Sequence, residues 1–443
     1  MPYIANTDDQ RRAMLEAMGL RAEDLFADVP SALRCGPLNL PEPLSEQQVR
    51  GRLAELAAKN HVELTLFLGG GFYDHFIPAA VYALTGRGEF YTAYTPYQPE
   101  VSQGTLQAIY EYQSMICRLT EMEAANASLY DGGTALYEAM MMALRRTRRR
   151  KILIDDSVNP IYRVMIQSHT RNLNIQLVET ANADGLANRR ALLDELDDDT
   201  AAVLVQNPNF FGCIDDYTDL AEAAHDKGAL LICSVYPISL GILKTPGAMG
   251  ADIVTGEGQS LGLPMSFGGP YLGFLATRKE HVRQMPGRIV GRTIDAEGRP
   301  GFVLTLQARE QHIRRDRATS NICSNEALCA LTALVYLSLL GKEGLREVAQ
   351  LCADKASYAY RKLTDIPGVG PRFHAKWVFN EMVLDLPCDA ADVIGRLIEK
   401  GFAAGFPLSR YYRGMDQSIL IAVTEKRTKQ EIDMLAAALE DVL

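Results

Sequence analysis

Short apolar runs alternate with helix-like segments through the middle of the chain. Most of these runs lack polar alternation, which is typical of strands that are buried on both faces. The helical segments between them favour right-handed crossovers and a mostly parallel sheet, and therefore an α/β domain of three layers. The predicted strands lie at residues 126–130, 151–155, 175–179, 201–206, 229–233, 252–256 and 272–276.

The regions before and after this middle part show different patterns of apolar residues. Apolar residues at helical spacing predict a helical arm near the N-terminus, and the stretch LNLPEPLSEQQ after it carries Ser45 and Gln48 at the spacing of a capping box. A long helical stretch at 325–341 precedes strand-like runs at 380–386 and 418–424, which alternate with helices. We expect a helical arm over residues 1–60, a large domain over 61–335 and a small C-terminal α+β domain over 336–443.

Composition and charge narrow the class of protein. The 443 residues are 47% hydrophobic and carry a formal net charge of -10, which disfavours a nucleic-acid binder because such proteins present a basic face. The one basic run, residues 145–151, follows an apolar helical segment, so we expect it at a helix C-terminus.

Cysteine usage and hydropathy indicate the compartment. The eight cysteines show no metal-ligand spacing, and Cys233 lies in an apolar run, as a buried thiol would. No apolar signal segment opens the chain and no run approaches ~18 apolar residues. We expect a cytoplasmic protein in a reducing compartment, with no metal site and no membrane partner.

Two glycine-containing loops carry polar side chains. Asp131 to Thr134 follow a predicted strand and open a helix, where free backbone amides favour a phosphate, although a turn capped by Thr134 explains the same residues. In LGGGFYDHFIP, residues 68–78, three glycines allow close approach of the backbone. His75 beside Asp74 fits either an oriented acid/base pair or a structural histidine.

Two further segments favour a pocket or an interface. Residues 90–104 combine tyrosines and prolines without a helix or strand period, which suits either a pocket loop or a loop packed on its own domain. Residues 307–321, QAREQHIRRDRATSN, gather arginines ahead of Thr319 and Ser320. Such a cluster is either a solvated helix face or a donor set for an anion or a partner subunit.

The stretch GADIVTGEGQSLGLPMSFGGPYLG, residues 250–273, resembles the segment of pyridoxal-phosphate enzymes that carries the cofactor lysine, but it has no lysine. The matching position is Ser260, preceded by Gln259, and a serine hydroxyl cannot form an imine. In the strand LLICSVYPISLG, Ser234 stands where an aspartate would pair with the pyridine nitrogen. We therefore expect no catalytic residue in this chain alone.

The chain resembles the N-terminal half, or subunit 1 type, of the glycine decarboxylase family, the P-protein of the glycine cleavage system. The resemblance rests on five motifs in order: LGGGFYDHFIPAAV, YTAYTPYQPEVSQG, ANASLYDGGTALYEA, GQSLGLPMSFGGPYLGF and REQHIRRDRATSNIC. It implies a pyridoxal-phosphate-dependent, aspartate-aminotransferase-like large domain of fold type I. The implied reaction is that of an aminomethyl-transferring glycine dehydrogenase, an oxidoreductase of glycine catabolism. It decarboxylates glycine and passes the aminomethyl group to the lipoyl arm of H-protein.

The resemblance also implies a site that is completed across a subunit interface. The lysine-bearing subunit 2 holds the pyridoxal phosphate, and this chain supplies Thr319 and Ser320 to the cofactor phosphate. Tyr94, Thr95 and Tyr97 line the entrance for glycine and the lipoyl arm. The expected assembly holds two copies of each subunit, and this chain is expected to be inactive alone.

Two other functions fit parts of the pattern. A non-catalytic scaffold or regulatory subunit of degenerate fold would need the interface but not the unusual loop residues. An autonomous pyridoxal-phosphate enzyme would need another lysine, such as Lys244 in GILKTPG, which precedes the expected strand and lies on the wrong side of the turn.

Overall fold

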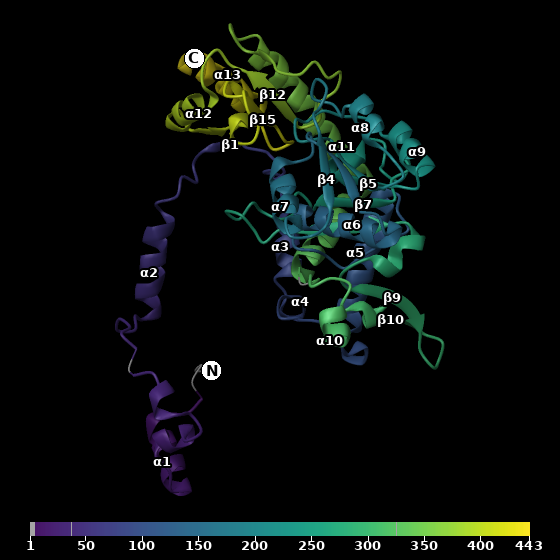
Figure 1. The fold of residues 1–443 in the computed structure, drawn as a ribbon. Helices are drawn as coiled ribbons and strands as arrows, with labels where there is room; N and C mark the ends of the chain where they lie inside the picture. The colour runs from purple at the N-terminus through teal and green to yellow at the C-terminus, as the bar shows by residue number, and fades with distance from the viewer. Residues whose placement is uncertain (1–4, 37, 325) are drawn as a thin grey trace. The chain divides into compact units, whose positions relative to one another are not determined.

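The computed structural model describes residues 5–36, 38–324 and 326–443 (Figure 1). The chain forms two compact units that divide after residue 62. The first unit is helical, and Ser45 begins its last helix in the predicted capping box with Gln48. Its elements are α1 (Asp8–Met18), the 3-10 helices η1 (Ala22–Phe26) and η2 (Ser31–Leu33), and α2 (Glu46–Ala57).

The second unit is built on a seven-stranded sheet of order β2-β8-β7-β6-β5-β3-β4. The strands from β7 to β4 pair in parallel, and β8 and β2 add two antiparallel pairings at one edge. The predicted, mostly parallel sheet is therefore confirmed. The strands are β2 (Ala124–Ala125), β3 (Lys151–Asp155), β4 (Gln176–Thr180), β5 (Thr200–Asn207), β6 (Leu230–Val235), β7 (Ile253–Glu257) and β8 (Gly273–Thr277).

The strand predicted at residues 126–130 is wrong, because β2 ends at Ala125. The following residues divide their hydrogen bonds between β8 and a loop outside the sheet. The Ala127 N–H donates to the Arg288 carbonyl, and the Asn126 amide donates to the Pro286 carbonyl. Leu129 forms one isolated bridge with Gly273. The apolar run is buried, but its hydrogen bonds hold the loop that later forms one wall of the candidate site.

Helices cover both faces of the sheet and make the three expected layers. Apolar residues of α6 (Gly132–Thr147) and α7 (Pro160–Thr170) pack on one face. The other face carries a second core, with residues from the remaining crossover and flanking helices. These are α5 (Gln103–Thr120), α8 (Arg189–Glu195), α9 (Thr218–Asp226) and α11 (Ala327–Thr364). The basic run 145–151 begins in the last turn of α6, as predicted.

A smaller antiparallel sheet of order β11-β12-β15-β14 forms the C-terminal part (yellow-green to yellow in Figure 1). The strands predicted at 380–386 and 418–424 are confirmed as β12 and β15. The elements here are β11 (Gly370–Pro371), β12 (Glu381–Asp385), α12 (Ala390–Glu399), β13 (Phe402–Ala404), β14 (Phe406–Pro407), the 3-10 helix η8 (Leu408–Arg410), β15 (Ser418–Ala422) and α13 (Lys429–Val442).

Two elements tie the C-terminal part to the rest of the second unit. Strand β1 (Thr65–Phe67) pairs with β13, so Phe67 lies in the C-terminal core rather than in the expected large domain. Helix α11 contributes residues to both cores and is interrupted at Gly341. By length and composition α11 could also cross a membrane, a property that core helices of folded proteins share. The expected boundary at 335/336 falls within this helix.

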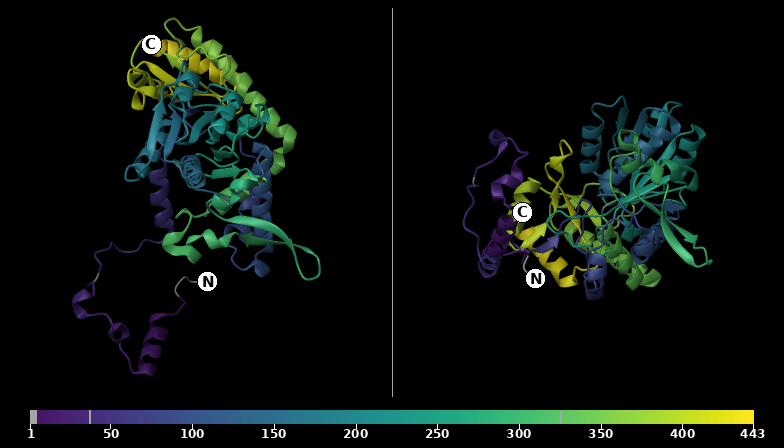
Figure 2. Two further views of the ribbon diagram at one scale, coloured as in Figure 1. Left: turned by 45° about the vertical axis from the view of Figure 1, so that its right-hand side comes forward. Right: turned by 90° about the horizontal axis from the view of Figure 1, so that it is seen from below.

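Most of the remaining elements form the rim of the carboxyl-end face of the seven-stranded sheet. A hairpin of β9 (Ile289–Ile294) and β10 (Pro300–Thr305) projects from the second unit, and α11 runs along the side of that unit (Figure 2). Residues 307–317 fold into three short helices rather than one. The rim helices are α3 (Ala79–Thr85), α4 (Gly88–Tyr91), α10 (Gln311–Arg314) and the 3-10 helices η3 (Pro99–Val101), η4 (Pro237–Gly241), η6 (Gln307–Arg309) and η7 (Arg315–Arg317). The 3-10 helix η5 (Lys279–Gln284) follows antiparallel β8 and so lies at the amino ends of the parallel strands.

Candidate active site

The two serines at the expected lysine and aspartate positions lie deep in the second unit. Ser234 belongs to β6 and Ser260 to the turn after β7, and both are buried. The Ser260 hydroxyl makes no hydrogen bond with any described residue. We name the region around Ser234, Ser260 and the N-terminus of α6 the cradle. It holds neither a lysine nor an aspartate at the two expected positions.

The N-terminus of α6 is capped by carboxylates of the chain itself. Asp131, rather than Thr134, is the N-cap: it accepts the Thr134 N–H at 2.8 Å, and Thr134 bonds back to it as a capping box. Glu257, the last residue of β7, accepts the Gly132 N–H at 2.9 Å. It also accepts the N–H groups of Gln259 and Leu272 at 2.9 and 3.0 Å. The phosphate expected here as one alternative would meet two acidic side chains.

The glycine-rich loop 68–78 lies against the cradle. The Tyr73 backbone makes two hydrogen bonds with the side chain of Gln259, the neighbour of Ser260. Glu381 of β12 accepts the Gly70 N–H at 2.6 Å and the Tyr73 hydroxyl at 2.7 Å. An added Cβ on Gly69 would overlap the Glu381 carboxylate, so the glycine is needed for this approach.

His75 and Asp74 do not form the acid/base pair that their adjacency suggested. Asp74 pairs with Lys426 and Arg427, at 2.7 and 3.1 Å. His75 is buried, with Nδ1 2.6 Å from Glu425 and Nε2 on the Tyr236 hydroxyl. The structural interpretation of His75 therefore fits its contacts.

Glu425 completes a buried cluster around His75. Cys352 lies 3.5 Å from its carboxylate, and the donor atoms of His75, Cys352 and Glu425 are close enough to hold a metal ion. Burial and the nearby Glu425 charge raise the pKa of Cys352, which keeps this thiol protonated. The contacts of Glu425 with His75 and Cys352 join the glycine-rich loop to α11 and to the C-terminal part.

A cavity of about 190 Å³ lies at the rim of the sheet, and we name it the rim pocket. It brings together three of the predicted residues, Thr319, Ser320 and Tyr97. The Ser320 hydroxyl donates to buried Glu138 at 2.6 Å, so it faces inward. The Thr319 hydroxyl makes no hydrogen bond with the described residues and remains available as a donor.

Two arginines that the sequence did not single out as a pair shape the rim pocket. Arg288 is 7% exposed and donates to the Ser324 carbonyl at 2.6 Å. Arg309 donates to the carbonyls of Met285 and Gly287, just before Arg288. Among the described residues no ion pair joins either guanidinium to a carboxylate, and both Nε atoms lack a hydrogen-bond partner.

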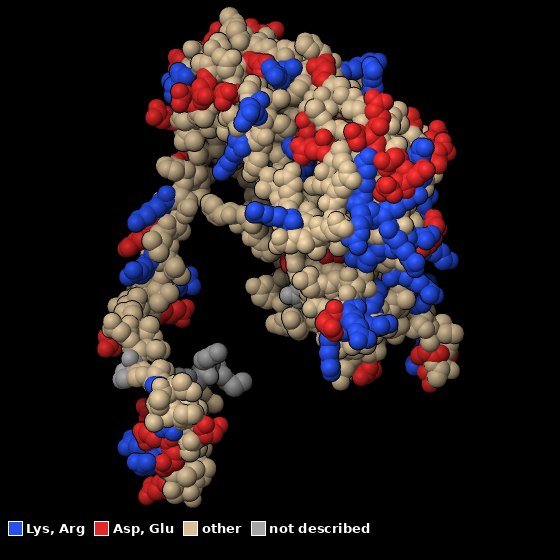
Figure 3. Space-filling view, in the orientation of Figure 1, with Lys and Arg blue, Asp and Glu red and all other residues tan. Residues whose placement is uncertain are grey.

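The surroundings of the rim pocket contain charges of both signs. Burial lowers the pKa of Arg309, and the charge of Glu310, which also lines the pocket, partly opposes this shift. The ring of His312 lies 5.3 Å from that of Tyr97, which also lies 5.8 Å from the Arg288 guanidinium. Lys and Arg also gather around α10 in Figure 3. The arrangement suits a small anion that is attached to a planar ring, because the guanidinium groups attract the anion and the Tyr97 ring can pack against a ring.

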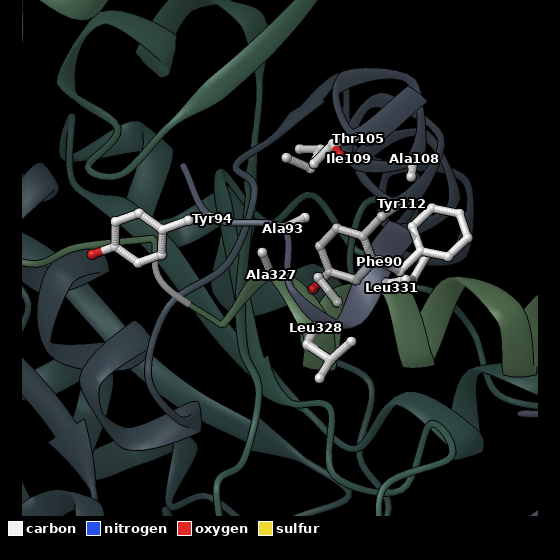
Figure 4. A pocket seen from close by; sticks show the side chains of 11 residues that line it. Phe90, Ala93, Tyr94, Thr105, Ala108, Ile109, Tyr112, Ala327, Leu328 and Leu331 are labelled. Carbon is white, nitrogen blue, oxygen red and sulfur yellow. The ribbon is translucent and has the colours of Figure 1, made fainter. Parts of the chain in front are cut away.

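Residues 90–104, which we name the tyrosine loop, form the wall between the rim pocket and an apolar slot. Tyr94 and Thr95 line a cavity of about 160 Å³ together with Arg288. Tyr94 also borders the apolar slot between α5 and the start of α11, where its exposed ring points away from the other labelled side chains (Figure 4). The slot is lined by Phe90, Ala93, Tyr94, Thr105, Ala108, Ile109, Tyr112, Ala327, Leu328, Ala330 and Leu331.

Lys244, the lysine of the autonomous-enzyme alternative, lies elsewhere. Its amine pairs with Asp216 at 2.9 Å and bonds to the Thr218 hydroxyl at 2.6 Å. A lysine amine that is held by a carboxylate and a hydroxyl is not positioned to act as a nucleophile. The structure therefore gives no support to that alternative.

Comparison with known proteins places the chain among close relatives. A family model described as glycine cleavage system P-protein matches residues 1–439. The chain is 57% identical to the probable glycine dehydrogenase (decarboxylating) subunit 1 of Geotalea uraniireducens over 100% of both chains. It is 54% identical to the protein of the same name from Oleidesulfovibrio alaskensis over 98% of both.

Solved structures show the same relationship. A crystal structure of glycine decarboxylase (P-protein) of the glycine cleavage system in inhibitor-bound form matches with a TM-score of 0.94 and 48% identity, over 100% of both chains. Glutamate decarboxylase from Lactobacillus brevis matches with a TM-score of 0.69 and 14% identity, over 93% of this chain and 96% of that one. The second likeness shows a shared fold alone.

Proposed function

This chain belongs to the glycine cleavage system P-protein family, and we propose that it is subunit 1 of a two-chain glycine dehydrogenase, decarboxylating and aminomethyl-transferring. The observation that carries the proposal is the contrast between the cradle, which lacks the catalytic groups, and the rim pocket, where no described carboxylate pairs with the buried Arg288 guanidinium and the Thr319 hydroxyl has no described acceptor. The predicted pyridoxal-phosphate fold type I architecture is that of the family. A partner chain would supply the missing lysine.

The cradle does not fit pyridoxal phosphate. It has Ser260 and Ser234 where the lysine and the aspartate would stand, and a Glu257 carboxylate lies on the amides that would receive a phosphate. A serine is too weak an acid to hold a pyridine nitrogen protonated. No step of the reaction therefore runs through this chain's own cradle.

The rim pocket fits the phosphate end of a cofactor that the partner, subunit 2, holds covalently. Thr319 would donate its hydroxyl, and Arg288 would balance the charge from a buried position. Ser320 would act indirectly, because its hydroxyl is bonded to Glu138. Pyridoxal phosphate, when bound, supplies an electron sink for the decarboxylation of glycine.

The tyrosine loop would form the entrance for glycine and for the lipoyl arm of H-protein. Tyr94 and Tyr97 are exposed at 77% and 50%, and Thr95 lies between them beside the same cavities. An apolar arm gains contact with aromatic rings and with the slot behind Tyr94. Closure of this entrance by the partner would exclude water from the reacting groups.

The assembly would contain two copies of each subunit in the cytoplasm. The eight cysteines are free thiols, four of them buried, which suits a reducing compartment. A regulatory scaffold would need the interface but would not need unpaired donors in the rim pocket, which favours the catalytic proposal.

The testing experiment measures glycine-dependent carbon dioxide exchange and cofactor absorbance for this chain alone, then with the lysine-bearing subunit and lipoylated H-protein. We expect no activity from the chain alone and activity on mixing. Activity of the isolated chain would contradict the proposal. Tyr94→Ala and Tyr97→Ala should assemble normally yet lose turnover, whereas the exposed control Tyr82→Ala should retain it; unchanged turnover in all three would favour the scaffold.

A further inference from the structure

The N-terminus of α6 is a place where an anion is favoured, because its first backbone N–H groups have no partner within the helix. Here the chain supplies that anion from a strand end more than a hundred residues away. One carboxylate oxygen of Glu257 accepts the Gly132 N–H, and the other accepts those of Gln259 and Leu272. Glu257 is 6% exposed, so this carboxylate is buried with three donors.

Packing around Glu257 leaves little room for a second anion. An added Cβ on Gly132 would lie 2.9 Å from the Glu257 nitrogen and 2.7 Å from the Tyr162 hydroxyl. Asp131 caps the same helix turn and adds a second negative charge. A phosphate would have to displace a buried carboxylate and approach another.

The cradle is also covered from the loop side. Gln259 is clamped by both backbone groups of Tyr73, and Glu381 holds Gly70 and the Tyr73 hydroxyl. The Tyr73 ring packs 4.5 Å from that of Tyr236, two residues beyond Ser234. Side chains from four separate segments therefore meet where a cofactor would lie.

We infer that Glu257 is an internal substitute for the cofactor phosphate, and that this chain's cradle is closed to phosphorylated ligands by its own side chains. If the cradle is closed, the phosphorylated ligands that this chain contacts in the assembled enzyme bind at the rim pocket. The inference does not depend on how the rim pocket works, so either proposal can fail alone.

The experiment compares the isolated wild-type chain with Glu257→Ala and the matched control Glu257→Gln. The probe is pyridoxamine 5′-phosphate, which forms no imine with surface lysines, and pyridoxamine is the phosphate-free reference. A hydrogen bond to a charged group is worth about tenfold in affinity or more, so Glu257→Ala should bind the phosphorylated probe at least about tenfold more tightly than wild type. Glu257→Gln should gain no such affinity, because its side chain still fills the position.

Hydrogen exchange on the wild-type chain keeps the inference testable if Glu257→Ala fails to fold. Amides in peptides covering residues 130–136 and 256–273 should show the same protection with and without the probe. Added protection there in wild type would overturn the inference. A folded Glu257→Ala chain whose affinity equals that of wild type would overturn it as well.

Discussion

The cradle and the rim pocket both offer donors to an anion, but they differ in what balances those donors. In the cradle, three backbone amides meet the carboxylate of Glu257. In the rim pocket, the guanidinium of Arg288 is buried with no ion pair among the described residues, and the Thr319 hydroxyl has no partner there. A buried guanidinium whose charge no carboxylate balances is costly in an isolated chain. The difference indicates that the cradle is complete within the chain and that the rim pocket is completed from outside.

The largest expected effect comes from forcing the missing lysine into the cradle. Ser260 is 2% exposed and is surrounded by the chain's own side chains, so Ser260→Lys would force a long side chain and a buried ammonium into a filled site. We expect a loss of about 3–5 kcal/mol in the free energy of unfolding, measured by urea denaturation. Borohydride treatment with pyridoxal phosphate should leave position 260 unlabelled.

The control for this change is Ser260→Ala, which removes a hydroxyl that has no hydrogen-bond partner in the described chain. Removing an unsatisfied buried group is nearly neutral or stabilising. A stable Ser260→Lys chain that acquires a covalent cofactor would mean that the cradle is open.

The next largest effect concerns the buried cation of the rim pocket. If Arg288 receives the cofactor phosphate in the assembled enzyme, Arg288→Gln should weaken cofactor retention by about 2–5 kcal/mol, as loss of one partner of a buried charge pair does. The measurement is cofactor release from the mixed subunits, followed by absorbance. Arg292→Gln, an exposed change in β9, the strand that follows Arg288, should retain the cofactor. Equal retention in both variants would remove Arg288 from the shared site.

The cradle also predicts a pH dependence of stability. Burial is the largest cause that raises the pKa of Glu257 and of Glu381 to about 7 each, from an ordinary value of 4.5. Asp131 raises the pKa of Glu257 further, whereas its backbone donors lower it. Between pH 4.5 and 7 the folded chain therefore binds more protons than the unfolded chain. The free energy of unfolding should fall as the pH rises through this window, by about 3 kcal/mol for each carboxyl group, and then level off.

Urea unfolding at several pH values checks this dependence by comparing wild type with the double variant Glu257→Gln and Glu381→Gln. The variant should show a smaller fall, which Asp155 still produces because burial raises its pKa to about 6, while the exposed control Glu343→Gln should keep the wild-type fall. A wild-type curve no steeper than that of the double variant would mean that both carboxyls ionise freely in the folded chain.

Residues that are adjacent in the sequence were a good guide to local structure and a poor one to the site. The strand at 151–155 and the capping box of Ser45 were predictable because a strand period and a cap depend on near neighbours. The partners of His75 and Asp74 were not predictable, because the residues that pair with them, 425–427, lie far along the chain. Arg288 carried no local signal, since what distinguishes it is the absence of a carboxylate around it in space.

The expected lysine position also shows what a sequence can and cannot predict. Its absence at Ser260 could be seen in the sequence, but the filling of the cradle by Glu257 and Glu381 could not. A single buried carboxylate after a strand is indistinguishable by pattern from a solvated one. Closure of the cradle therefore emerges only when β7, β12 and α6 are seen together.

The smallest expected effect tests the rim pocket through one hydroxyl. Thr319→Val keeps the shape of the side chain and removes a donor that has no partner within the described residues, so the isolated chain should unfold at the same urea concentration as wild type. In the assembled enzyme, the lost hydrogen bond to a phosphate should weaken cofactor affinity by about 1.5 kcal/mol, or roughly tenfold. Thr319→Ser retains the hydroxyl and should restore most of that affinity. If both variants bind the cofactor as wild type does while Arg288→Gln does not, the anion is held by the charge of Arg288 alone. The two sites would then differ in one feature: the cradle contains its own anion, Glu257, whereas the rim pocket contains a cation, Arg288, that receives its anion from outside.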